Sequence, residues 1–175
     1  FERAAGLTDE DAERGQSLAR AGDLAAMGGR VDEAVPLLEK AIQILDAAGQ
    51  NAEAASAEAR LGEVLFSTGR IEEGVALLER ALAVHDEAGD EAAIAPVSAQ
   101  LGRLLFFEAR REDAMPHVER ALELSERLRL ADVVVQGLIN KALLLQHRPN
   151  ESLGLMRQAL VLAEETGADR GALRA

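Results

Sequence analysis

The stretch LGEVLFSTGRIEEGVALLERAL, residues 61–82, recurs forty residues later as LGRLLFFEARREDAMPHVERAL, residues 101–122. Looser copies lie around LEKAI at 38–42 and MRQAL at 156–160. A Gly-Arg pair or its counterpart stands before each LERAL-like string, at 29–30, 69–70, 109–110 and 147–148, with offsets of 40, 40 and 38. Because several markers share one spacing, the sequence predicts about four copies of one structural unit.

Each unit is predicted to be a pair of helices. In the second half of the units, apolar residues follow helical spacing, as Ala34, Leu38, Ala41 and Leu45 do, and the first halves behave likewise around Leu61 and Leu65. The alternation typical of strands is absent. We expect helices at about 9–28, 31–47, 51–67, 71–87, 91–108, 111–129, 131–146 and 150–166.

The predicted fold is all-α, a right-handed superhelical solenoid of antiparallel helix hairpins that forms a single domain over residues 1–175. The repeats are expected at about 9–49, 50–89, 90–130 and 131–167. A lone hairpin buries too few apolar side chains to offset the entropy of ordering it, so neighbouring hairpins must stack. Residues 1–5 are predicted to end a preceding repeat and 168–175 to begin a following one, as in a fragment of a larger protein.

Small residues and turn residues have predicted structural roles. Glycines at 22, 62 and 102 and alanines at 41, 81 and 121 are expected where helices approach closely. Thr8, Asp90 and Asp169 are candidate helix caps. Pro96 is expected to kink its helix or to delay the start of that helix.

Taken together, these residues resemble the tetratricopeptide repeat family. Leu61-Gly62 with Gly74, Leu78 and Ala81 follows the family pattern, as do Leu101-Gly102 with Ala114, Val118 and Ala121. The family's Trp and Tyr are missing, and the unit of about 40 residues resembles the long-repeat branch. The run GR-(I/V)-(E/D)-E, then LLE(R/K)A(L/I) and LGRLLFF, resembles the helical-repeat region of large bacterial AAA-type ATPase and nucleotide-cyclase regulators.

Composition excludes several kinds of function. The chain has no cysteine, which excludes disulfides and thiolate metal sites and favours a cytoplasmic location. A net charge of −12 disfavours nucleic acid and anionic membranes as partners. The three histidines have no metal-site spacing and are expected to be solvated or locally hydrogen-bonded, and no phosphate loop or nucleophile elbow is present. We therefore predict no enzyme activity, no cofactor and no metal site.

A partner-binding groove is the predicted functional site. In tetratricopeptide arrays the residue two after the first-helix Leu commonly faces the groove, and here that series is Asp23, Glu63, Arg103 and Lys141, with Phe66 and Phe106 nearby as apolar anchors. Such a groove would suit a peptide with a basic end and an acidic end. Alternatively, the four charges pair with neighbouring helices and the phenylalanines belong to the core between repeats.

The predicted function is a non-catalytic protein-interaction and scaffold module, a regulatory segment of a larger bacterial signalling protein. One alternative is a sensory domain that binds a peptide or small ligand in the concave groove. Another is an accessory domain of an ATPase or nucleotide cyclase whose catalytic modules lie elsewhere in the chain. Uncovered apolar residues at the last hairpin predict end-to-end association of the truncated fragment: Leu143, Leu144, Leu145, Leu153 and Leu160.

Overall fold

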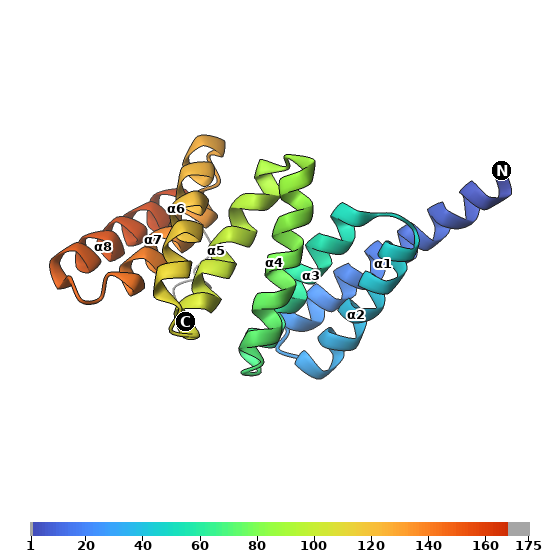
Figure 1. Cartoon of the computed structure of the whole chain (residues 1–175), viewed down its shortest axis with the longest axis horizontal. Coiled ribbons are helices and arrows are strands. Elements are labelled where there is room, and N and C mark those ends of the chain that lie inside the picture. The colour runs from blue at the N-terminus through green and yellow to red at the C-terminus, as the bar shows by residue number, and fades with distance from the viewer. Residues whose placement is uncertain (1, 168–175) are drawn as a thin grey trace. The chain divides into compact units, whose positions relative to one another are not determined.

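The computed structural model describes residues 2–167, and these residues form eight α-helices and no strand (Figure 1). The predicted all-α class is therefore confirmed. The bounds predicted for the second and third helices agree with the structure, and those of the last five differ by at most two residues. The helices are α1 (Glu2–Met27), α2 (Val31–Ala47), α3 (Asn51–Ser67), α4 (Ile71–Ala88), α5 (Glu91–Phe107), α6 (Arg111–Leu128), α7 (Ala131–Leu144) and α8 (Pro149–Thr166).

The first helix is longer than predicted. We expected a turn before residue 9, but α1 runs without a break from Glu2, and Thr8 lies inside it. The segment before residue 9 contains no proline, so nothing in it forces the helix to stop. Asp169 and the expected following repeat at 168–175 lie outside the described residues.

Contacts divide the chain into two compact units. Unit 1 is Phe1–Gly89 and contains α1 to α4, and unit 2 is Asp90–Ala175 and contains α5 to α8. Within unit 1, α1 packs on α2, α2 on α3 and α3 on α4, and unit 2 repeats this order from α5 to α8. Each unit is thus two stacked hairpins, and the boundary coincides with the predicted end of the second repeat.

The turn inside the first three hairpins depends on a left-handed residue. Gly29, Gly69 and Ala109 have φ angles of 71°, 78° and 61°. This conformation reverses the chain and turns the next amide back onto the helix that has just ended. The resulting hydrogen bonds run from Arg30 to Ala25 at 2.8 Å, from Arg70 to Leu65 at 3.0 Å and from Arg110 to Leu105 at 2.9 Å.

The arginine of each Gly-Arg pair fastens the turn to the next helix. Its guanidinium pairs with an acidic side chain three residues on, in the first turn of the second helix, where the helix dipole also favours negative charge. Arg70 lowers the pKa of the Glu73 carboxyl through its hydrogen bonds. The pairs are Arg30–Glu33 at 3.2 Å, Arg70–Glu73 at 2.6 Å, Arg110–Asp113 at 2.9 Å and Arg148–Glu151 at 3.4 Å.

The predicted close approaches between helices are confirmed. A Cβ added at Gly22 would lie 2.7 Å from Cγ of Leu38, and one added at Gly62 would lie 3.0 Å from the carbonyl oxygen of Gly74. Because these distances leave no room for a methyl group, glycine lets the two helices of each hairpin touch. The predicted small positions of the second helices, Ala41, Ala81 and Ala121, are fully buried.

Two predictions about helix starts have clear outcomes. Asp90 caps α5, since its carboxylate accepts a hydrogen bond from the amide of Ala93 at 3.2 Å. Helix α5 begins directly after this cap, so Pro96 does not delay its start.

The last hairpin departs from the others. Helix α7 has 14 residues whereas α3 and α5 have 17. The hydroxyl of Ser152 donates to the carbonyl oxygen of Ala142 at 2.9 Å, which places Ala142 against α8 as Gly102 lies against Ala114. Helix α7, the first helix of this hairpin, therefore keeps the offset of 40 from α5. The shorter offset of 38 applies only from the turn between α7 and α8 onward. Leu144, expected to be uncovered, is buried at 3% exposure.

His85 and Asn140 are buried polar side chains. His85 is only 1% exposed, so of the expected solvated or locally hydrogen-bonded states the solvated one is excluded. It continues the apolar stripe of α4 one turn after Leu82, and this register faces the core. Asn140 is also 1% exposed, donates to the carbonyl oxygen of Ala99 in α5 at 2.8 Å and accepts from Gln136 at 3.0 Å.

Candidate functional site

An open hollow of about 480 Å³ lies in unit 1, between the ends of α1 and α3. It is called the α1–α3 hollow here. Its lining comes from α1, the start of α2 and α3: Asp23, Ala26, Met27, Val31, Arg60, Glu63, Val64 and Ser67.

Repeat geometry positions the two sides of this hollow. Asp23 and Glu63 occupy the same place in successive repeats, and so do Met27 and Ser67. Asp23 and Met27 are four residues apart in α1, and Glu63 and Ser67 are four residues apart in α3, so the two residues of each helix lie one above the other on one helix face. The contact between α1 and α3 brings these faces together. The sequence pattern had identified the two acidic residues of the hollow, Asp23 and Glu63.

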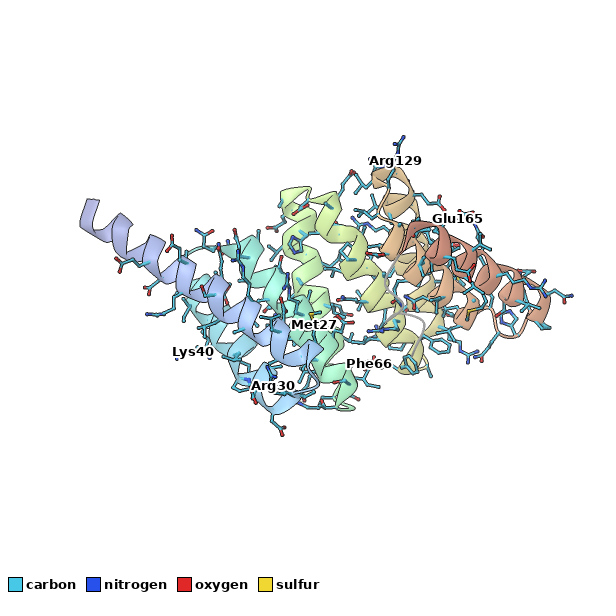
Figure 2. The ribbon with its side chains drawn as sticks, turned by 180° about the vertical axis from the view of Figure 1, so that it is seen from behind. Met27, Arg30, Lys40, Phe66, Arg129 and Glu165 are labelled. Carbon is cyan, nitrogen blue, oxygen red and sulfur yellow. The ribbon has the colours of Figure 1, made fainter. Side chains whose placement is uncertain are left out.

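The apolar side of the hollow is open to solvent. Met27 is 84% exposed, a large fraction for a methionine, and Val31 and Ala26 are half-buried beside it. Figure 2 shows Met27 at the C-terminal end of α1 and Phe66 at the corresponding end of α3. Phe66 is half-buried and is not part of the lining. An accessible thioether beside aliphatic groups can adapt to apolar side chains of different shapes.

The charged side of the hollow carries a small negative excess. Asp23 forms an ion pair with Arg60 of α3, and Glu63 lies one turn beyond Arg60. Two carboxylates and one guanidinium give the lining a formal charge of −1. Asp23 thus has a partner on a neighbouring helix, as the alternative interpretation of the charge series expected.

The other predicted site residues lie in unit 2. The edge of one ring of Phe106 and Phe107 meets the face of the other, with ring centroids 5.3 Å apart and planes at 78°, and the Arg111 guanidinium lies 5.5 Å from the Phe106 centroid. Phe107 is 51% exposed. Phe107 and Arg111 were not predicted as site residues, although they belong to the doubled FF and RR at 106–107 and 110–111. Arg103 is half-buried on α5.

Lys141 is engaged at a helix contact of unit 2. Its ammonium lies 3.3 Å from the carboxylate of Glu119 in α6. Because α7 keeps the offset of 40, Lys141 corresponds to Leu101 and not to Arg103. The structure therefore brings Asp23 and Glu63 together in one hollow, whereas a groove with all four charges stays a prediction.

Residues 2–167 contain neither a metal-ligand cluster nor a helix suited to span a membrane. No group of three or more His, Asp and Glu side chains in this range is arranged to hold a metal ion. Among the described helices, none has both the length and the hydropathy of a membrane span.

Sequence comparison supports the repeat pattern. Residues 53–127 match the model of the tetratricopeptide repeat family. The tetratricopeptide match covers α3 to α6, which include the two most regular copies of the repeat. No curated protein sequence matches the chain.

Solved structures extend the tetratricopeptide-like likeness to nearly all of the chain. Aspartyl phosphate phosphatase F from Bacillus subtilis is 14% identical with a TM-score of 0.77, over 94% of this chain and 43% of the phosphatase. BtubC (BKLC) from P. vanneervenii is 19% identical with a TM-score of 0.73, over 97% of this chain and 75% of that protein. A Podosopora anserina putative kinesin light chain with nearly identical TPR-like repeats is 17% identical with a TM-score of 0.67, over 96% of this chain and 89% of that chain.

These likenesses concern the fold. All three identities are low, so what is shared is the helical-repeat architecture, in agreement with the predicted α–α solenoid class. The chain spans less than half the length of the phosphatase.

Proposed function

We propose that the chain is a non-catalytic protein-interaction module, a regulatory segment of a larger cytoplasmic signalling protein of bacterial origin. The tetratricopeptide match at 53–127 supports the interaction role, because repeats of this kind generally bind protein partners. The regulatory and bacterial parts of the proposal rest on the sequence resemblance described above. The α1–α3 hollow is the observation that carries the proposal to particular residues.

The lining of the hollow defines the chemistry of its partner. Met27 and Val31 offer apolar contacts, and Glu63 adds negative charge beside the Asp23–Arg60 pair. A peptide with a Leu, Met or Phe side chain next to an Arg or Lys would place its apolar side chain on Met27 and Val31 and its cation near Glu63. The hollow is therefore proposed to bind an apolar-basic peptide segment.

Peptide selection tests this proposal directly. A random peptide display library is panned on the wild-type chain, and the affinity of the selected peptides is then measured by calorimetry. We expect enrichment of apolar residues next to Arg or Lys. Glu63→Lys should weaken binding about tenfold or more, because it reverses the charge that faces the cation. Met27→Ala should weaken binding by removing the apolar contact without affecting folding, since Met27 is 84% exposed.

Glu79→Lys is the matched control. It causes the same change in net charge on the exposed surface of α4, outside the hollow, so it should alter affinity only about as much as screened long-range charge does. Selected peptides that bind the Glu63→Lys and Met27→Ala variants as tightly as wild type would overturn the assignment to this hollow. Failure to enrich any peptide would overturn the peptide-binding function itself.

The size of the hollow favours one second candidate. A volume of about 480 Å³ is within the range of small-molecule sites, so a sensory role with a small apolar cation as ligand is the alternative. A panel of such cations would raise the melting temperature of the wild type and not of the Glu63→Lys variant. End-to-end association of copies would involve apolar residues outside the hollow, such as Leu153 and Leu160.

A further inference from the structure

Helix α8 exposes residues that the equivalent helix α2 uses to contact its neighbour. In α2, Val35 and Ile42 are half-buried and pack against the core cluster that includes Leu61, Val64 and Leu65 of α3. The same repeat positions of α8 are Leu153 and Leu160, and these are 49% and 46% exposed. With Val161, which is 51% exposed, they form an apolar surface, here called the α8 face.

Helix α1 exposes the complementary half of the same contact. In α3, the residues that pack towards α2 include Ala57, Leu61 and Val64, all buried at 2% to 7% exposure. Their counterparts forty residues earlier are all exposed, with Leu24 at 66%. This surface is called the α1 face and consists of Ser17, Ala21 and Leu24.

We propose that the α8 face of one copy binds the α1 face of a second copy, in the same way that α2 binds α3. Leu160 would pack over Ser17 and Ala21 as Ile42 packs over Ala57, and Leu24 would take the place of Val64. The contact is directional, because one copy supplies its last helix and the other its first. A head-to-tail contact leaves one face of each kind free, so association continues beyond the dimer unless a ring closes.

A second copy is favoured because one chain carries both halves of a contact whose geometry unit 1 already contains. Small side chains on α1 receive large ones on α8, which is the size relation between Ala57 and Ile42. Each copy carries a charge of −12, so copies repel each other at low ionic strength. The association is thus apolar and strengthened by salt, whereas a contact based on ion pairs would be weakened.

Analytical ultracentrifugation of the whole chain tests the proposal, from about 10 µM to about 1 mM. The weight-average mass of the wild type should rise above the 18.6 kDa of one chain as concentration and salt increase. Leu160→Glu copies lack a working α8 face, and Leu24→Glu copies lack a working α1 face, so each variant alone should remain monomeric. A mixture of the two variants retains one intact face of each kind and should form a dimer and nothing larger.

Leu128→Glu is the control, because it introduces the same charge at a leucine of α6 that belongs to neither face and is 36% exposed. It should associate like the wild type, and circular dichroism should show the same helix content for all variants. A wild type that stays monomeric throughout the range, or variants that associate separately, would overturn the proposal. The proposal would also be overturned if a chain shortened to residue 167 associated while the wild type did not, because residues 168–175 would then prevent the association.

Discussion

Ala109 is one of two described non-glycine residues, with Arg129, that have a left-handed backbone conformation. It has a φ of 61°, in the turn where the first two hairpins have glycine, and a residue with a Cβ is strained in this region. The hydrogen bond from Arg110 to Leu105 requires the same backbone path as in the other turns, so the strain is retained.

Exchanging the two residue types should therefore change stability in opposite directions. Ala109→Gly relieves the left-handed strain and should stabilise unit 2 by about 0.5–1 kcal/mol, less than the full strain because glycine also makes the unfolded chain more flexible. Gly69→Ala should destabilise unit 1 by about 1 kcal/mol, although nothing lies within 4 Å of the added Cβ. Urea unfolding of both variants measures this, and shifts of the same sign would contradict it.

The sequence predicted some residue roles and missed others for physical reasons. Glycines at close approaches follow from spacing, because only a missing side chain fits between touching helices. His85 was expected to be solvated or locally hydrogen-bonded, although its spacing after Leu82 already placed it on the apolar stripe, and it is buried there. Phe107 was missed because helical spacing selects one phenylalanine of the FF pair and leaves its neighbour on another face.

At the scale of elements, the contact between the helices of a hairpin is the most sensitive feature. Gly102→Ala would place a methyl group 2.5 Å from Cγ2 of Val118 and 3.2 Å from the carbonyl oxygen of Ala114. The backbone oxygen cannot move away by a rotamer change, so α5 and α6 must separate. We expect a loss of about 1–3 kcal/mol in the free energy of unfolding.

Gly154→Ala is the matched comparison. Gly154 lies exposed within α8 with nothing within 4 Å of an added Cβ, so alanine brings only its higher helix propensity. This variant should gain about 0.5–1 kcal/mol. If chemical denaturation shows Gly102→Ala to be as stable as wild type, the close approach of α5 and α6 is wrong.

Apart from α1, helix starts were predicted better than helix ends. Periodicity fixed α2 and α3 to the residue because a left-handed turn precedes each of them. The start of α1 was missed because Thr8 is a good cap but does not oblige a helix to begin, and Ala-rich sequence on either side is equally helical. The register of α7 was also missed, because the two residues by which the offset shortens from 40 to 38 are lost at the end of α7 and not before it.

At the scale of the whole molecule, net charge governs which polymers the chain approaches. The chain carries 31 acidic and 19 basic side chains, and ion pairs such as Arg60–Asp23 and Arg80–Glu58 use basic groups that would otherwise meet phosphates. We therefore expect no binding to a short labelled DNA duplex at about 50 mM salt, where electrostatic binding is strong. Fluorescence anisotropy measures this, with a cationic protein of similar size as control, and a rise that salt reverses would contradict it.

The candidate site was predicted only in part. The repeat offset placed Asp23 and Glu63 at equivalent positions, and the contact of α1 with α3 brings these positions together. The ion pair of Asp23 with Arg60 joins residues 37 positions apart, and the pair of Lys141 with Glu119 joins α7 to α6. Such pairings depend on side-chain directions between helices, which periodicity along one helix does not determine.

The buried amide of Asn140 allows only one register of α7 against α5. Apolar side chains tolerate a slip of one helical turn, about 5.4 Å, because one aliphatic contact replaces another. An amide does not, since its acceptor at Ala99 would be lost and a dry donor costs about 1–3 kcal/mol. Asn140 thus selects one register of α7 against α5 in unit 2. Replacing Asn140 with leucine would leave a core of similar volume but would remove the hydrogen bond that favours this register over the others.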